Sequence, residues 1–289
     1  MPYVTRLPNR SLLVVGGEDR RAFLQGLVSN DVNKVTAERA IWSAFLTPQG
    51  KFLWDVFIAE RGDELLLETE AERIEEFRKK LSMYKLRTKV TIAVAEGVSV
   101  FAVWGEGAAS SMGLPDEAGA AKAGDGTVAM VDPRLAAAGL RVYAAAAPAG
   151  AAEASFEAWD EHRIRLGLPD GSRDLPVEKA ILLENGFDEL NGVDFQKGCY
   201  MGQELTARTK HRGLVRKRLM PVTIDGPLPA SGTPVMRGDA EAGEMRSSVG
   251  ASGLALIRLE HFRQGGEFRC GDAVLAPRQP EWAVFPEGE

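Results

Sequence analysis

The sequence is poor in the residues that build metal sites and disulfide frameworks. Its 289 residues include two cysteines, Cys199 and Cys270, and three histidines, and no Cys-x-x-Cys pair occurs. Two cysteines cannot form the disulfide framework of a small secreted protein, and they are too few for a self-contained zinc site. We therefore expect a reducing compartment and no resident metal.

Long hydrophobic runs are also missing. The N-terminal residues MPYVTRLPNR have no apolar core of the kind that secretory signals carry. The longest stretch of small apolar residues, 144–152, is interrupted by Pro148 and Gly150 and falls far short of the ~20 residues that a membrane span needs. These absences predict a soluble, cytoplasmic protein without membrane contact. Nothing in the sequence indicates an obligate oligomer, so we expect a monomer.

Charge of neither sign dominates the chain. The 35 basic and 41 acidic side chains give a net charge of -6, which argues against a wholesale nucleic-acid coat. One segment, residues 208–218, is nevertheless basic and contains no acid: its cations are Arg208, Lys210, Arg212, Arg216, Lys217 and Arg218. It could hold a phosphate, a polyglutamate tail, RNA or an acidic partner, or be a solvated face without a partner. Aromatic residues that would stack on single-stranded RNA are not interleaved with it.

The pattern of apolar residues in the first two thirds of the chain predicts a mixed fold. Strands are expected over 11–15, 41–46, 52–58, 65–68, 90–94 and 98–103, and helices are expected from Glu18 and over 70–84. This order lacks regular βαβ alternation and favours an α+β sheet with helices on one face. Residues 105–150 are rich in Ala and Gly and are expected to form a subdomain break, mostly surface loops around strands at 128–132 and 140–143.

The last third of the chain predicts a helix followed by a series of short strands. A helix over 156–166, capped by Ser155, is followed after Arg212 by short strands between Pro and Gly turns. The expected strands are 218–224, 235–236, 247–249, 254–258 and 273–275. Short strands at this spacing are typical of a small β-barrel. We therefore divide the chain into an α+β body over 1–212 and a C-terminal β-barrel over 213–289.

One segment, DFQKGCYMGQE at 194–204, concentrates reactive side chains. Its glycines allow a sharp loop, and Lys197 lies two residues from Cys199, where a cation would favour the thiolate. A thiolate can attack an electrophile, bind a soft metal or ligate an iron–sulfur cluster. The alternative is that Cys199 is a small buried hydrophobe, which is our interpretation of Cys270. No serine or histidine completes a catalytic triad, and His162 is expected at the surface.

The same loop, KGCYMGQE at 197–204 followed by Ala207-Arg208, resembles the signature of the YgfZ family. These are folate-binding proteins related to the T-protein (aminomethyltransferase) of the glycine cleavage system. Shorter matches keep the family's order: FLQG at 23–26, NDV at 30–32, QGK at 49–51 with Asp55, YKLR at 84–87, Trp159, RI at 163–164, GLP at 167–169, and Pro176 with Glu178. The resemblance implies a T-protein-like folate-binding body with a C-terminal β-barrel, arranged around a central opening.

The resemblance also implies a function and a ligand. The implied protein is an accessory factor rather than a classical enzyme. It binds tetrahydrofolate and helps to assemble, insert or repair iron–sulfur clusters in client enzymes, some of which modify tRNA. Its partners would be folate and iron–sulfur client or assembly proteins.

Individual residues receive roles from the same resemblance. The implied catalytic residues are Cys199, Lys197 and Asp55. Those implied to bind folate are Trp159, Arg163, Glu178, Tyr200, Gln203 and Glu204. Trp159 would supply a flat wall for the pterin, and Glu178 a carboxylate for its N–H groups. Alternatively, Trp159 is packed in the core, and Glu178 is an exposed acid paired with Lys179 or Arg173.

Two positions depart from the family's pattern. Some members carry a second folate-facing tryptophan where this chain has about Arg10, and Trp54 stands where T-proteins place the first of two adjacent acids, leaving only Asp55. Losing an acid removes a proton carrier, which weakens a second interpretation, a folate-dependent aminomethyltransferase or demethylase acting in one-carbon transfer. A third interpretation is an RNA- or protein-binding module that uses residues 208–218.

Overall fold

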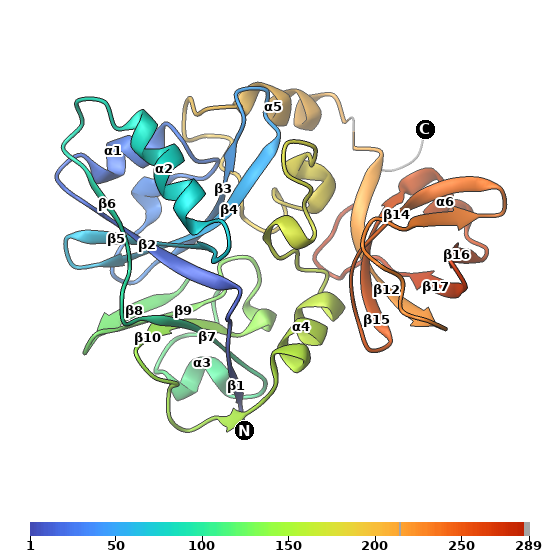
Figure 1. The fold of residues 1–289 in the computed structure, drawn as a ribbon, viewed down its shortest axis with the longest axis horizontal. Coiled ribbons are helices and arrows are strands. Elements are labelled where there is room, and N and C mark those ends of the chain that lie inside the picture. Colours follow the sequence, from blue (N-terminus) through green and yellow to red (C-terminus); the bar gives the residue numbers. More distant parts are fainter. Residues whose placement is uncertain (214, 286–289) are drawn as a thin grey trace.

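The computed structural model describes residues 1–213 and 215–285 (Figure 1). The chain forms an N-terminal body of two β-sheets and a C-terminal closed barrel. The predicted α+β class with a C-terminal barrel is therefore confirmed. Leu214, in the basic segment, and residues 286–289, at the end of the predicted barrel domain, lie outside the described residues.

The first sheet carries the helices that the sequence predicts on one face. Its antiparallel strands follow the order β3 (Ile41–Leu46), β4 (Phe52–Arg61), β5 (Glu64–Glu70), β2 (Arg10–Gly16) and β6 (Thr91–Val94). Helices α1 (Arg20–Gln25) and α2 (Ile74–Tyr84) pack on one face with Val56 and Ile58, whereas Phe57 belongs to the cluster on the other face. Side chains alternate between faces because successive residues of a strand point in opposite directions.

The predicted start of the second helix was wrong. Glu70 is the last residue of β5, and α2 begins only at Ile74. The intervening residues form a turn in which the Arg73 amide donates to the Glu70 carbonyl. The Arg73 guanidinium then reaches the carbonyl oxygen of Leu53 at 2.6 Å, which fixes this turn against β4.

The second sheet packs against the free face of the first. Its order is β11 (Ala152–Glu153), β1 (Tyr3–Arg6), β7 (Ser99–Trp104), β10 (Leu140–Ala144), β9 (Thr127–Val131) and β8 (Ala121–Gly124). Three of these strands, with α3 (Ala108–Ser111) and the short helix η2 (Ala136–Ala138), come from residues 105–150. The strands expected at 128–132 and 140–143 are confirmed as β9 and β10, whereas the surface loops expected around them also contain β8, α3 and η2. The strand AKAG was missed because it is only four residues long and its alanines and glycine give little apolar signal.

A chain of short elements connects the body to the barrel. Helix α4 (Phe156–Arg165) begins at Ser155, whose Oγ accepts a 3.2 Å hydrogen bond from the Ala158 amide, as the sequence predicts. It is followed by the 3₁₀ helices η3 (Gly171–Arg173) and η4 (Leu182–Asn185) and then by α5 (Gln203–His211). In Figure 1 these elements lie between the two-sheet body and the barrel.

The barrel closes in the order β12 (Lys217–Asp225), β15 (Ser252–Arg258), β14 (Ala240–Val249), β13 (Pro234–Arg237), β16 (Phe268–Cys270) and β17 (Ala273–Pro277), with α6 (Leu259–Gln264) beside it. Cys270 is buried in its core, in agreement with the interpretation from the sequence. The chain then returns to the body, where the Trp282 indole donates to the Leu166 carbonyl at 2.7 Å. Within residues 1–213 and 215–285, no helix has the length and apolar character required to cross a membrane.

Candidate functional site around Cys199

Cys199 lies on an exposed loop that leads into helix α5. Gly198 and Gly202 flank it with φ of 89° and 79°, in the left-handed region that favours glycine. A Cβ added at Gly198 would meet open space, whereas one at Gly202 would collide with the carbonyl oxygen of Thr47 in the β3–β4 hairpin. The loop therefore has a free tip at Cys199 and a base pressed against the hairpin.

Lys197 holds this loop on the end of helix α1. Its Nζ donates to the carbonyl oxygens of Gln25 at 2.8 Å, Val28 at 2.5 Å and Asn30 at 2.7 Å. Burial lowers the pKa of Lys197 to about 8, against the opposing effect of Asp31 and Asp194. The ammonium group uses its three hydrogens on these carbonyls, and no hydrogen bond joins it to Cys199 in the described ranges. The contacts of Lys197 position the loop. They do not show the role predicted from the sequence, in which Lys197 stabilises the Cys199 thiolate.

Tyr200 and Gln203 complete the base of the loop. The Gln203 Oε1 accepts a 3.1 Å hydrogen bond from the Tyr200 amide, and the Met201 amide donates to the Gly26 carbonyl at 3.0 Å. The centroid of the Tyr200 ring lies 5.1 Å from Lys197 Nζ. Burial raises the pKa of the Tyr200 hydroxyl to about 12. Glu204 is exposed and pairs with Arg208 on the same helix. Tyr200 and Gln203 therefore shape the loop from within, whereas Glu204 contacts only its own helix among the described residues.

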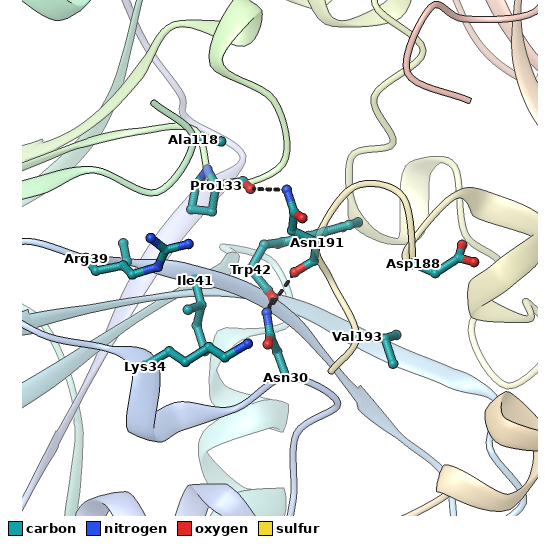
Figure 2. A pocket seen from close by; sticks show the side chains of 11 residues that line it. Asn30, Lys34, Arg39, Ile41, Trp42, Ala118, Pro133, Asp188, Asn191 and Val193 are labelled. Atoms are coloured by element: carbon teal, nitrogen blue, oxygen red, sulfur yellow. Dashed lines mark hydrogen bonds between the residues drawn. The ribbon is translucent and has the colours of Figure 1, made fainter. Parts of the chain in front are cut away.

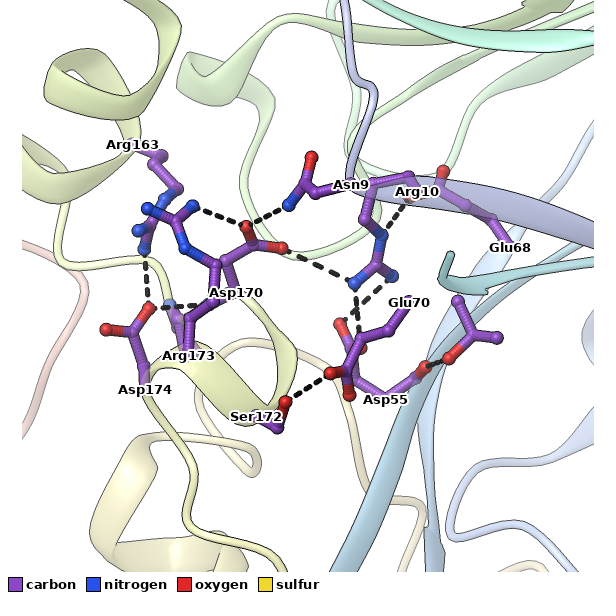
Figure 3. Close-up of polar contacts among 12 residues, drawn as sticks. Asn9, Arg10, Asp55, Glu68, Glu70, Arg163, Asp170, Ser172, Arg173 and Asp174 are labelled. Atoms are coloured by element: carbon purple, nitrogen blue, oxygen red, sulfur yellow. Dashed lines mark hydrogen bonds and ion pairs between the residues drawn. The ribbon is translucent and has the colours of Figure 1, made fainter. Parts of the chain in front are cut away.

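Asp55 lies in a different place, in a buried network of charges between the two sheets (Figure 3). Arg10 Nη1 and Nη2 donate to its two carboxylate oxygens at 3.0 and 3.3 Å, and the Trp42 indole donates to it at 3.3 Å. Arg10 also pairs with Glu68 at 2.8 Å and with Asp170 at 3.4 Å. Asp55 is 1% exposed. A carboxylate so enclosed does not match the proton carrier predicted at this position.

The network extends toward the second sheet through residues that sequence reasoning missed. Arg141 pairs with Glu68 and lies 3.1 Å from Asp132, which Arg134 also pairs at 2.7 Å. Burial alone would raise the pKa of Asp132, but the two guanidinium groups lower it to about 2. The sequence signal was the presence of charged residues in or directly after apolar strands: Glu68 lies in β5, Arg141 lies in β10, and Asp132 directly follows β9.

Two of the predicted folate-binding side chains, Trp159 and Arg163, are buried and make contacts within the protein. Trp159 is 3% exposed and packs against Trp104, 5.5 Å away, and His162, 5.7 Å away, whose rings also stack on each other. Arg163 is buried and donates to Asp160 and Asp174 at 2.6 Å each and to Ser247 of the barrel at 3.0 Å. Trp159 has no free face for a pterin, and Arg163 ties α4 to the barrel. The core packing weighed as the alternative for Trp159 is the one that the structure shows.

Glu178 and His162 also differ from what the sequence predicts. Glu178 is exposed and adopts φ of 61°, and within residues 1–213 and 215–285 its carboxylate forms no ion pair with Lys179 or Arg173. His162, expected at the surface, is half-buried: its Nε2 lies 3.1 Å from the Ala137 carbonyl oxygen, and burial lowers its pKa. The predicted residues do not together fit a pterin, and tetrahydrofolate binding stays a prediction.

Acidic partners reduce the positive field of residues 208–218. Arg208 pairs with Glu204, and Lys210 pairs with Asp188 at 2.9 Å. Arg218 is buried against Glu189 and donates to the Leu183 carbonyl at 3.2 Å. At least half of the cations that the sequence places here therefore serve contacts within the chain.

Comparison with known proteins places this geometry in a family. Residues 216–285 match the family model of the CAF17 C-terminal β-barrel domain. The mitochondrial iron–sulfur cluster assembly factor IBA57 of Mus musculus is 38% identical, with 96% of this chain and 84% of the relative covered. The chain belongs to the IBA57 family of iron–sulfur cluster assembly factors. The IBA57 protein of Homo sapiens is 36% identical over the same shares of both chains.

Structural comparison supports the same architecture. The aminomethyltransferase T of the glycine cleavage system from Bartonella henselae superposes with a TM-score of 0.77, covering 98% of this chain and 86% of that one. The identity is 13%, so this likeness shows the fold alone. The predicted kinship with iron–sulfur assembly proteins of T-protein-like fold is thus confirmed, and the family shown is IBA57.

Proposed function

We propose that this chain takes part in iron–sulfur cluster assembly by presenting the Cys199 thiolate to a cluster shared with a partner protein. The observation that carries the proposal is the construction of the loop: a free tip at Cys199 above a base held by Lys197. Its family membership supplies the class of cargo.

The chain offers one accessible thiol for this task. Cys270 lies 1% exposed in the barrel core, and Cys199 is exposed. Iron–sulfur clusters are held by several ligands, usually four cysteines. A cluster that contacts Cys199 would therefore take its remaining ligands from a partner, as suits an intermediate in transfer.

The test compares two cysteine variants in cells that depend on this chain. Cys199→Ser should abolish the activity and cluster content of a four-iron client enzyme, while Cys270→Ser should preserve both. Thermal unfolding of the two purified variants separates loss of function from loss of fold. Full client activity with folded Cys199→Ser would remove the thiol from the mechanism.

The resemblance to the YgfZ family adds two finer proposals: tetrahydrofolate as a ligand and tRNA-modifying enzymes among the clients. A fluorescence titration with tetrahydrofolate tests the first, and measurement of modified nucleosides in depleted cells tests the second. The aminomethyltransferase alternative gains no support from Asp55, because Arg10 occupies both of its carboxylate oxygens.

A further inference from the structure

A small cavity opens where three segments of the body, residues 30–42, 118–133 and 188–193, meet (Figure 2). Its volume is about 160 Å³. Trp42 and Ile41 come from β3, Pro133 comes from the connection that follows β9, and Asn191 and Val193 come from the loop that runs toward Cys199. Lys34 and Arg39 reach it from the segment between α1 and β3. None of these residues belongs to the predicted folate set.

The charges around this cavity leave one positive charge uncompensated. Lys34 Nζ pairs with Asp194 at 2.6 Å, and the carboxylate of Asp188 pairs with Lys210 at 2.9 Å. Arg39 has no side-chain hydrogen bond or ion pair in the part of the chain that the structure describes. In Figure 2 its guanidinium extends toward Pro133, across the cavity from Asn191. Asp188 Oδ1 is buried without a hydrogen-bond partner among the described residues, and Figure 2 places Asp188 on the opposite side from Arg39. The Arg39 side of the cavity therefore suits an anion with a single charge.

The walls of the cavity are fixed before any ligand arrives. Asn30 Nδ2 donates to the carbonyl oxygens of Trp42 at 2.8 Å and Asn191 at 2.7 Å. The Asn191 amide group donates in turn to the Pro133 carbonyl at 3.3 Å. The Trp42 ring stacks on Phe187 with centroids 3.9 Å apart. A preformed site loses less conformational entropy on binding than a mobile one.

The cavity is joined to the Cys199 loop by direct contacts. Asn30, whose side chain forms one wall, accepts a hydrogen bond from Lys197 Nζ on its carbonyl oxygen at 2.7 Å. Asp194, which holds Lys34, lies in the segment that leads to Lys197. A ligand seated at Arg39 would therefore lie next to the residues that position Cys199.

We propose that this cavity binds a single carboxylate group through Arg39. The planar fork of an arginine matches a carboxylate with two parallel hydrogen bonds. A cavity of ~150 Å³ accepts a ligand of about the size of benzene, so the carboxylate would carry only a short carbon chain, packed on Ile41 and Val193. The group could come from a free short-chain carboxylic acid or from an acidic side chain of an assembly partner; the second source alone rests on the proposed function.

The test is an NMR titration of the cluster-free protein, followed through the amide signals of Trp42 and Asn191. Propionate and butyrate represent the free acid, N-acetylglutamate methylamide represents a protein side chain, and propionamide is the neutral control. Carboxylates should shift both signals and propionamide should not. The tighter of the two carboxylate classes identifies the source.

Two arginine variants decide whether Arg39 is the ligand. Arg39→Gln should weaken carboxylate binding at least tenfold, whereas Arg6→Gln, at an exposed position of β1, should leave it unchanged. Absence of carboxylate-dependent shifts in the wild-type protein, or equal affinity in Arg39→Gln, would overturn the proposal. Because no cluster is present, this failure is distinct from a failure of Cys199 to act in assembly.

Discussion

Arg10 and Asp55 form a two-point ion pair in the interior, with Nη1–Oδ1 at 3.0 Å and Nη2–Oδ2 at 3.3 Å. The pair spans from β2 to β4 across the intervening strand β5. This chain thus buries an acid of β4 and pairs it with an internal cation of β2. The acid ties β4 to β2 within the first sheet, and Arg10 carries the network through Glu68 to Arg141 of the second sheet.

Removing Arg10 should destabilise the protein strongly. Arg10→Met leaves Asp55 and Glu68 buried without this partner, and breaking a buried pair typically costs about 3–5 kcal/mol. Urea unfolding measures the change. The control is Arg61→Met, which removes a partly exposed pair with Glu64 and should cost less than about 1 kcal/mol. Equal losses in the free energy of unfolding for the two substitutions would show that the buried pair stabilises the protein no more than the partly exposed one.

The paired carboxylate of Asp132 should make stability fall in acid. Its pKa in the folded protein is about 2, below the value of about 3.9 in an unfolded chain. The folded state therefore binds fewer protons between these values. The stabilisation is complete above about pH 4 and is lost as the pH falls through about 2, an effect on the order of 2 kcal/mol.

The measurement compares wild-type protein with Asp132→Asn by urea unfolding at several pH values. The asparagine variant lacks this titration, so the stability difference between the two proteins should shrink between pH 4 and pH 2. A difference that stays constant over this range would mean that Asp132 does not titrate with folding.

Two glycines of the Cys199 loop allow a matched test of its base and its tip. Gly202→Ala places a Cβ against the Thr47 carbonyl at a positive φ, so it should destabilise the protein and reduce client activity. Gly198→Ala meets open space and should cost only about 1–2 kcal/mol for placing an L-residue at positive φ. Thermal unfolding and the four-iron client assay give the two readouts. If Gly198→Ala proves the more damaging, the base of the loop is not the rigid part.

The sequence predicted those features that depend on neighbouring residues. Ser155 caps α4 as expected, the Gly50 turn joins β3 to β4, and the glycines around Cys199 produce an exposed loop. The partners of Arg10 could not be predicted from local sequence, because Asp55 is 45 residues away and Asp170 is 160 residues away along the chain. Only the folded topology brings such charges together.

Trp159 shows why residue type alone misled the prediction of the folate site. An aromatic residue on a helix suits a ligand wall or a core equally well, and the choice depends on what covers it. Here Trp104 and His162 pack against Trp159. Lys197 is a similar case. Its proximity to Cys199 in the sequence suggested that its charge stabilises the thiolate, whereas its Nζ donates hydrogen bonds to three carbonyl oxygens at and after the end of α1.

The positioning role of Lys197 leads to a prediction about local motion. Lys197→Met removes the donor shared by the carbonyls of Gln25, Val28 and Asn30, so the loop should detach more often from the end of α1. Amide hydrogen exchange at Met201, whose N–H bonds to Gly26, should become faster, and client activity should fall. Lys89→Met, which removes an exposed pair with Glu18 away from the loop, should leave exchange at Met201 unchanged. Unaltered exchange in Lys197→Met, together with lost activity, would instead return Lys197 to a direct chemical role beside Cys199.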